Sequence, residues 1–202
     1  MTFSGPVPRM KSIDVGSSCG QDPHPIAEES VVVNENQTLR NVVVYLDGAG
    51  PARSEPMKDS VTLDQKHCRY DPHVVAVEVG QTLRVTNSDP AVHNVHWLGS
   101  ENPGWNFGQQ SGGKPVDLKL ERPELAIRVK CDVHPWMTAY VAVFDHPWFA
   151  VTGESGEFEI KGAPPGEYKL VAWHERLGRR VSDVTISPEK PAEVMFEYKA
   201  PE

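Results

Sequence analysis

Short runs in which apolar and polar residues alternate recur along most of the chain, separated by turns rich in Gly and Pro. The clearest run places Val75, Val77 and Val79 on one side, and after a Gly-Gln turn the alternation continues through Leu83 and Val85. A period of two is typical of a β-strand with one buried face. We expect these two runs to form a hairpin.

Further runs of the same kind predict strands along the rest of the chain. They cover residues 11–15, 30–33, 41–46, 116–120, 126–131, 139–143, 158–160, 163–173, 184–186 and 194–198. Residues 99–115 are rich in Gly, Asn and Gln, and predict a long loop. Because heptads and helical stripes are missing, we predict an all-β fold.

Composition narrows the class of protein. The chain has 202 residues, enough for one large or two small domains, with 18 Pro and 16 Gly as expected for many turns. Its formal net charge of -8 argues against nucleic acid and anionic membranes as partners, and is compatible with a basic protein partner. Since no apolar run approaches the roughly 18 residues of a membrane helix, we expect no membrane span.

Three soft or borderline metal ligands, Cys131, His134 and Met137, fall within seven residues. With one more His upstream, this spacing is the ligand set of a trigonal His₂Cys copper site with a weak axial Met. Strand alternation puts Cys131 on the same face as Ile127 and Val129, so its sulfur emerges from the core side of the strand. The segment therefore predicts one mononuclear copper site.

The remaining histidines divide by position. His93 and His96 are three apart in an extended segment, so their side chains point to opposite faces and only one can reach a common ion. For His96 we expect a surface or supporting role. His67 and His73 flank Cys68, but they are six residues apart, too far for one ion unless the strand bends.

Three cysteines leave one over if two form a bond. With Cys131 assigned to the metal, counting favours a disulfide between Cys19 and Cys68. A disulfide indicates an oxidising compartment, and we expect a periplasmic or secreted protein whose signal was removed before Met1. The first residues lack the apolar core of a secretion signal, so a cytoplasmic protein is the alternative.

Residues 61 to 145 resemble a cupredoxin, a blue copper electron carrier of the amicyanin and plastocyanin type. The resemblance is carried by Tyr70-Asp71-Pro72, Val79-Gly80, Asn87-Ser88-Asp89, His93-Asn94-Val95-His96 and Cys131-Asp132-Val133-His134-Pro135-Trp136-Met137. It implies a Greek-key β-sandwich with copper held by His93, Cys131, His134 and Met137. It also implies that Asn94 supports the cysteine sulfur and ties the two ligand loops together.

This resemblance implies a periplasmic type 1 (blue) copper protein that carries single electrons between redox partners, such as a cytochrome c or a dehydrogenase. Electrons are expected to pass through the solvent edge of His134, with Trp136 as an apolar rim that excludes water or as plain packing. The alternative is a copper chaperone or storage module. We expect no enzyme, because copper oxidases and nitrite reductases place a His beside the ligand Cys, and here the neighbours are Lys130 and Asp132.

The tail, from Thr152 to Trp173, resembles a transthyretin-like, carboxypeptidase regulatory-type β-sandwich through its Gly-flanked turn, Phe-x-Ile and Pro-Pro-Gly-x-Tyr. We predict three segments. Residues 1–55 supply strands that complete the C-terminal sandwich, residues 56–146 form the cupredoxin domain, and residues 147–202 form the smaller, transthyretin-like sandwich. Insertion of one domain into the other is physically easy when the ends of the host chain are close. A tandem arrangement is the alternative.

Overall fold

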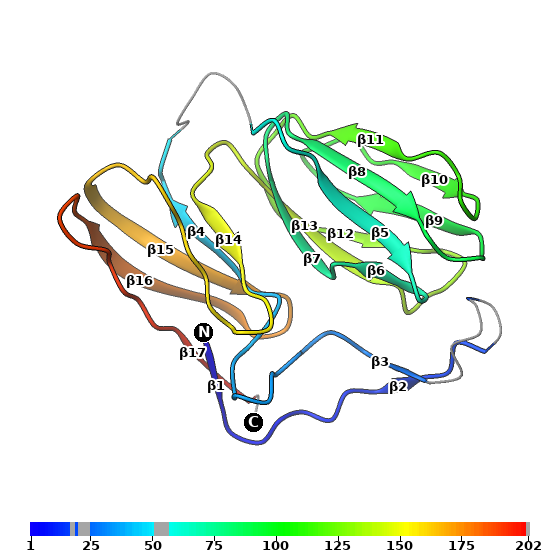
Figure 1. Ribbon diagram of the computed structural model, residues 1–202, viewed down its shortest axis with the longest axis horizontal. Helices are drawn as coiled ribbons and strands as arrows, with labels where there is room; N and C mark the ends of the chain where they lie inside the picture. The colour runs from blue at the N-terminus through cyan, green and yellow to red at the C-terminus, as the bar shows by residue number, and fades with distance from the viewer. Residues whose placement is uncertain (17–18, 20–24, 51–56, 201–202) are drawn as a thin grey trace. The chain divides into compact units, whose positions relative to one another are not determined.

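The computed structural model describes residues 1–16, 19, 25–50 and 57–200 (Figure 1). Every regular element in these ranges is a β-strand, so the all-β prediction is confirmed. Within the same ranges, no helix is long and apolar enough to cross a membrane.

The chain divides into two compact units. Unit 1 consists of Met1–Met10, Glu29–Ala52 and His146–Glu202, and unit 2 consists of Lys11–Glu28 and Arg53–Asp145. Unit 2 therefore interrupts the chain of unit 1 twice. The predicted boundary between residues 55 and 56 lies outside the described residues.

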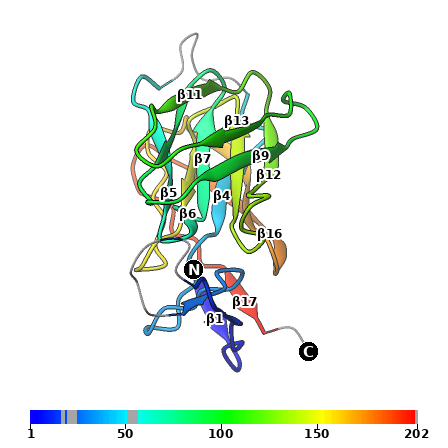
Figure 2. The same cartoon turned by 90° about the vertical axis from the view of Figure 1, so that its right-hand side faces the viewer.

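Unit 2 is built mainly from nine strands in two sheets (Figures 1 and 2). They are β5 (Val61–Lys66), β6 (Arg69–Asp71), β7 (Val74–Glu78), β8 (Thr82–Asn87), β9 (His93–Leu98), β10 (Asn106–Gln109), β11 (Val116–Lys119), β12 (Glu124–Lys130) and β13 (Thr138–Phe144). One sheet has the order β10-β9-β12-β13-β7, and the other has the order β11-β8-β5-β6. A short pair, β2 (Ser12–Ile13) and β3 (Ile26–Ala27), completes the unit.

Alternate residues of the two sheets meet in a single apolar core. Leu83 and Val85 come from one sheet, Val95, Val129 and Val141 come from the other, and all five are fully buried. Burying each such side chain stabilises the fold by about 1.5–3 kcal/mol. The core therefore fixes the ends of β9 and β12, where the candidate metal ligands begin.

The predicted hairpin of the two Val-rich runs is wrong. β7 pairs in parallel with β13, and β8 pairs in parallel with β5, so the chain passes from one sheet to the other at Gly80. Gly80 has a φ of 78°, a conformation that suits glycine. Alternation shows only that a strand has one buried face; here both strands bury that face in the same core from opposite sheets. The predicted loop at 99–115 also contains a strand, β10, which pairs with β9.

Unit 1 contains a four-stranded sheet with the order β14-β4-β15-β16. Its strands are β4 (Val43–Asp47), β14 (Phe149–Val151), β15 (Gly166–His174) and β16 (Gly178–Ile186). A parallel pair, β1 (Thr2–Ser4) with β17 (Glu197–Lys199), joins the two ends of this unit. β4 precedes most of unit 2 in the chain, yet it pairs with β14 and β15, which follow unit 2.

Two predicted strands of unit 1 are not strands. In 30–33, Val33 makes only an isolated bridge to Leu39, and Phe158 and Ile160 pack against the core from an irregular segment. The spacing of the apolar residues indicates that they are partly buried, but it does not indicate whether a neighbouring strand has a free edge with which they can pair. The transthyretin-like identity of unit 1 stays a prediction.

Candidate metal centre

Antiparallel pairing of β9 with β12 brings the start of one strand next to the end of the other. His93 is the first residue of β9, and Cys131 directly follows β12, with Lys130 opposite His96 in the register. His134 and Met137 lie in the turn that leads to β13. Backbone hydrogen bonds from Met137 N to His134 O (2.9 Å) and from Cys131 N to Met137 O (3.2 Å) close this turn.

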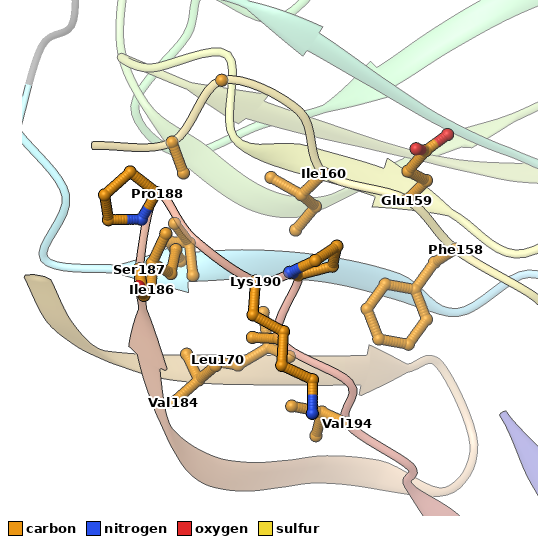
Figure 3. Close-up of a pocket in the computed structure, with 15 residues that line it drawn as sticks. Phe158, Glu159, Ile160, Leu170, Val184, Ile186, Ser187, Pro188, Lys190 and Val194 are labelled. Carbon is orange, nitrogen blue, oxygen red and sulfur yellow. The ribbon is translucent and has the colours of Figure 1, made fainter. Parts of the chain in front are cut away.

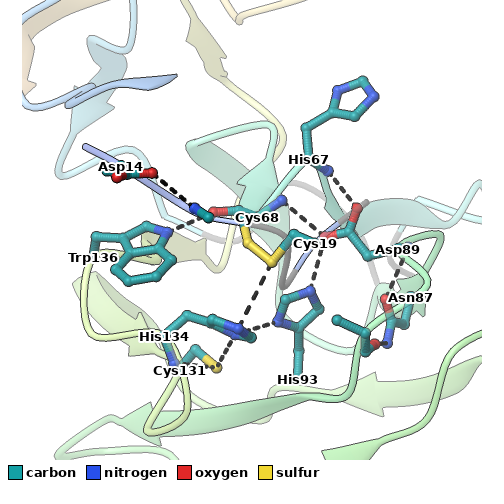
Figure 4. The surroundings of a disulfide bond; sticks show 12 residues. Asp14, Cys19, His67, Cys68, Asn87, Asp89, His93, Cys131, His134 and Trp136 are labelled. Carbon is teal, nitrogen blue, oxygen red and sulfur yellow. Dashed lines mark hydrogen bonds and ion pairs between the residues drawn. A yellow bond between two sulfur atoms is a disulfide. The ribbon is translucent and has the colours of Figure 1, made fainter. Parts of the chain in front are cut away.

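The inner edges of two imidazoles converge on the thiol. Nδ1 of His93 lies 2.8 Å from Nδ1 of His134, and Sγ of Cys131 lies 3.8 Å from the same His134 nitrogen (Figure 4). All three side chains are buried. Met137, only 1% exposed, packs in the same core cluster as Cys131. The structure thus brings together the side chains of His93, Cys131 and His134, and it places Met137 in the same core as Cys131.

The charges of this cluster are coupled. Burial acts to lower the pKa of His93, but hydrogen bonds with Asp89 and Cys131 outweigh it and raise the pKa to about 9. Burial acts to raise the pKa of the Cys131 thiol, but the hydrogen bond with His93 and those from backbone N–H groups lower it overall. The pKa of His134 is lowered by burial and by the nearby His93. Cys131 is therefore biased toward the thiolate, the form that binds metals.

Asn94 connects the two ligand segments. Its backbone N–H points at the sulfur of Cys131 (3.5 Å), and its side-chain oxygen accepts a 2.6 Å hydrogen bond from the backbone N–H of Asp132. His96 lies on the other face, half-buried, with Nδ1 2.8 Å from the Asp132 carboxylate. Asn94 thus occupies the bridging position that the resemblance implied, and His96 lies away from the cluster of candidate ligands.

The outer edges of the same two imidazoles are covered. Nε2 of His93 lies 2.8 Å from the Asp89 carboxylate, and Nε2 of His134 lies 3.7 Å from Sγ of Cys19, which forms a disulfide with Cys68 (Figure 4). The expectation that His134 has a solvent edge is wrong, since its residue is only 6% exposed. The expectation came from the resemblance, which began at residue 61 and so omitted the segment that carries Cys19.

Asp89 is the site residue that sequence analysis missed. It lies in the segment Asn87-Ser88-Asp89, four residues before His93 in the chain. Its carboxylate also accepts hydrogen bonds from the backbone N–H groups of His67 (2.6 Å) and Cys68 (2.8 Å). A carboxylate this close in sequence to a candidate ligand was the available signal.

Trp136 forms part of the rim of the cluster. Its ring centroid lies 5.3 Å from that of His134, and its Nε1 donates a 3.2 Å hydrogen bond to the carbonyl oxygen of Cys68. The ring is partly buried against the core. Trp136 therefore packs beside the ligand turn and also ties it to the disulfide.

The predicted alternative metal ligands, His67 and His73, lie apart. The side chain of His67 is exposed, and the buried ring of His73 packs edge-on against Tyr140 at 5.9 Å between ring centroids. Among the described residues, neither belongs to a group of three close ligand atoms.

Unit 1 holds a separate pocket of about 390 Å³ (Figure 3). Its lining is mostly apolar, including Phe158, Ile160 and Val184, and its two charged residues, Glu159 and Lys190, are exposed. It offers apolar contact, and none of the described residues that line it is a His or a Cys. The cluster in unit 2 is therefore the better candidate for chemistry.

The donor set of this cluster fits a copper ion. A thiol biased toward the thiolate, two imidazole nitrogens that face each other and a buried thioether are the ligand types of a blue copper site. In the neutral form, one Nδ1 proton can be shared between His93 and His134. A metal ion held here would take the place of that proton and would be bound by the Nδ1 lone pairs of both residues.

Comparisons with known proteins add little beyond this geometry. No family model matches the chain, and no curated protein does. One similar solved structure is a copper-containing nitrite reductase from Thermus scotoductus SA-01, with 18% identity over 47% of this chain and 26% of that one, at a TM-score of 0.39. Amicyanin mutants match with 18% and 20% identity over 50% of this chain and 97% of theirs, at TM-scores of 0.37 and 0.38. Such scores carry no functional argument.

Proposed function

We propose that unit 2 binds one copper ion through His93, Cys131, His134 and Met137, and that the protein carries single electrons. The observation that carries this proposal is the convergence of both Nδ1 atoms, 2.8 Å apart, with the Cys131 sulfur 3.8 Å from one of them. Copper bound by a thiolate, two imidazoles and a weak thioether alternates between Cu(I) and Cu(II).

The chain contributes rigidity and charge balance to this chemistry. The pairing of β9 with β12 holds His93 and Cys131, while two backbone hydrogen bonds hold the turn from His134 to Met137. The N–H groups of Asn94 and His134 point at the sulfur at 3.5 and 3.4 Å and stabilise its negative charge. A ligand set fixed in this way reorganises little between two oxidation states.

An electron carrier is favoured over an enzyme by what flanks the thiolate ligand. Blue copper enzymes need a histidine beside that cysteine to reach a second metal centre, and Cys131 stands between Lys130 and Asp132. The carboxylate of Asp132 is already paired with Lys130 and His96 and accepts a hydrogen bond from the side chain of Asn94. The partner we propose is a redox protein such as a cytochrome c or a dehydrogenase, with a basic surface because this chain carries a net charge of -8.

A periplasmic or secreted location is part of the proposal. The disulfide between Cys19 and Cys68 supports it, because such bonds persist in oxidising compartments. Labelling of free thiols in the protein taken directly from its source cells, compared with the same chain after reduction, tests this point.

Visible and electron-spin spectra of the copper-loaded chain test the electron-carrier proposal. We expect an intense thiolate-to-copper charge-transfer band that is lost in Cys131→Ser, whereas His96→Asn keeps it. A copper form without this band, or a band that survives in Cys131→Ser, would falsify the proposal.

A copper chaperone or storage role is the second candidate, and burial of His134 favours it. With Cys19 lying over Nε2 of this residue, the edge through which a partner would exchange electrons is closed. Voltammetry separates the two roles. A reversible couple within the range of soluble redox proteins supports the carrier, and the absence of any reversible couple supports storage.

A further inference from the structure

The disulfide lies among other metal-binding groups. Cys19, His93 and His134 form one group whose ligand atoms all lie within 4.8 Å of one another, and Cys19, Cys68 and Asp89 form a second group of the same kind. All five residues are buried, and Cys19 belongs to both groups (Figure 4). This cluster is distinct from the proposed copper ligands, because it faces the Nε2 edges of the histidines rather than their Nδ1 edges.

The oxidation state of the two sulfurs decides what this cluster can do. A disulfide sulfur carries no charge and is a poor ligand, whereas a thiolate is a strong one. A dithiol reductant cleaves the bond by thiol exchange: the S–S bond receives two electrons and two protons and gives two thiols, and the reductant becomes a disulfide. A metal ion then displaces the thiol protons.

We propose that Cys19, Cys68, Asp89 and Nε2 of His134 form a second metal site, which exists only when the disulfide is reduced. Two thiolates, one imidazole and one carboxylate oxygen suit a tetrahedral divalent ion such as Zn²⁺ or Co²⁺. Nε2 of His134 is 3.7 Å from Cys19 Sγ already in the oxidised chain.

The carboxylate of this site is held in place beforehand. Asp89 accepts hydrogen bonds from His67 N, Cys68 N and Nε2 of His93 at 2.6–2.8 Å. A carboxylate offers about four lone-pair positions, so three hydrogen bonds leave one for a metal ion. Asp89 is thus held with an oxygen within 4.8 Å of both sulfur atoms and is not saturated by hydrogen bonds.

Cys19 stays close to Cys68 after the bond opens. β2 and β3, on either side of Cys19, pair with each other, and Glu28 N donates a 2.9 Å hydrogen bond to Lys11 O. Arg69, which follows Cys68, donates a 3.2 Å hydrogen bond to the carbonyl oxygen of Ala27. These contacts hold the segment to unit 2 by means other than the disulfide.

The two sites share one imidazole, and this makes them compete. A neutral imidazole has a lone pair on only one nitrogen, so His134 serves either the copper ligands through Nδ1 or the new site through Nε2. When the disulfide is reduced, the site of Cys19 and Cys68 therefore competes with the site of Cys131 for the imidazole of His134.

A cobalt titration of Cys131→Ser tests this proposal independently of the proposed function, because that variant lacks the copper thiolate. We expect the reduced variant, freed of reductant and kept without oxygen, to bind one Co²⁺ with thiolate-to-cobalt absorption and the visible bands of tetrahedral Co²⁺. The oxidised variant is expected to show neither. In the reduced chain, Cys131→Ser/Cys68→Ser is expected to lose the tetrahedral spectrum, and Cys131→Ser/His134→Gln to bind at least about tenfold more weakly.

Three results overturn the site. One is equal cobalt spectra for the oxidised and reduced variants, and another is an unchanged affinity in His134→Gln, which shows that the imidazole takes no part. The third comes from circular dichroism: a reduced chain that has lost its strand signal and does not regain it with Co²⁺ has no folded site. Wild-type protein that fails to turn blue with copper leaves this test intact and bears only on the proposed function.

Discussion

Nε2 of His93 lies 2.8 Å from a carboxylate oxygen of Asp89, and the two side chains are only 0% and 2% exposed. A carboxylate can only accept, so the neutral imidazole keeps its proton on Nε2 and its lone pair on Nδ1. In that neutral form, the lone pair faces Nδ1 of His134, 2.8 Å away, on the side where His93 also hydrogen-bonds with Cys131. Asp89 is not one of the proposed copper ligands, but its carboxylate thus sets which nitrogen of His93 can bind a metal.

Asp89→Asn is expected to weaken copper binding by about 10- to 100-fold, because an amide nitrogen cannot accept one of the three hydrogen bonds that Asp89 now receives. Competition with a coloured chelator measures this. Asp117→Asn is the matched control, since Asp117 is exposed and pairs with Arg84 away from the ligands. Equal affinities in the two variants would contradict the role of Asp89.

Removing the disulfide is expected to destabilise the metal-free chain. The bond joins residues separated by 49 positions, and Cys19→Ser/Cys68→Ser is expected to lower the free energy of unfolding by about 2–4 kcal/mol. Urea unfolding followed by circular dichroism measures the loss. Cys131→Ser, which leaves the disulfide intact, serves as the comparison, and a smaller loss in the double variant than in this one contradicts the prediction.

The same double variant is expected to exchange electrons faster when loaded with copper. Cys19 covers Nε2 of His134 at 3.7 Å. The pairing of β2 with β3 keeps the segment beside unit 2, but without the cross-link residue 19 is no longer fixed against this imidazole edge, so a partner can approach the edge more closely. We expect the electron self-exchange rate to rise several-fold, measured from NMR line broadening in mixtures of the two oxidation states. An unchanged rate would show that electrons pass elsewhere, for example beside Trp136.

Met137→Leu is expected to keep the copper and its colour while raising the reduction potential. Met137 is 1% exposed in the core, and Leu has a similar volume, so the cost in stability should stay below about 1.5 kcal/mol. Loss of the thioether removes electron donation, which matters more to Cu(II) than to Cu(I). Voltammetry beside wild type checks the direction, and a lower potential in the variant argues against axial ligation.

Glu124 anchors the turn after β9, and we expect its contribution to the free energy of unfolding to be lost in acid. Its carboxylate accepts hydrogen bonds from Ser100 and Asn102, from both backbone and side chain in each case. Burial acts to raise the pKa of Glu124, but these hydrogen bonds outweigh it and lower the pKa below its ordinary value of 4.5. The contribution is therefore complete above about pH 4.5 and is lost as the pH falls through the lowered value.

Urea unfolding of Glu124→Gln at several pH values tests this anchor. At pH 7 the variant is expected to be less stable by about 1–3 kcal/mol, as for a hydrogen-bonded charged group. The difference from wild type should shrink toward pH 3. Glu121→Gln, an exposed neighbour, is the control, and a difference that stays constant with pH would refute the assignment.

The grouping of the candidate copper ligands could be predicted from sequence because its signal is local. Cys131, His134 and Met137 lie in one turn, and alternation along β12 correctly put the cysteine on the buried face beside Val129. Counting cysteines likewise gave the pair Cys19 and Cys68, which the structure joins. In each case the needed information lies in residue type and spacing.

Strand partners could not be predicted in the same way. The runs at β7 and β8 have the alternation of a hairpin, yet each pairs with a distant strand in a different sheet. Alternation reports which face of a strand is buried and says nothing about which edge is free to bond. The irregular segment at Phe158 and Ile160 shows the same limit.

The sequence by itself determined the all-β class, the soft ligands near Cys131 and the cysteines available to form a disulfide, since periodicity, ligand chemistry and counting are properties of residue type. Only the tertiary structure decided what stands against the outer edges of the histidines. Asp89 reaches His93, and Cys19 reaches His134 across 115 positions of chain. Such contacts join residues that are far apart in the chain or meet only through strand pairing and core packing. The periodicity of apolar residues along the sequence does not reveal them.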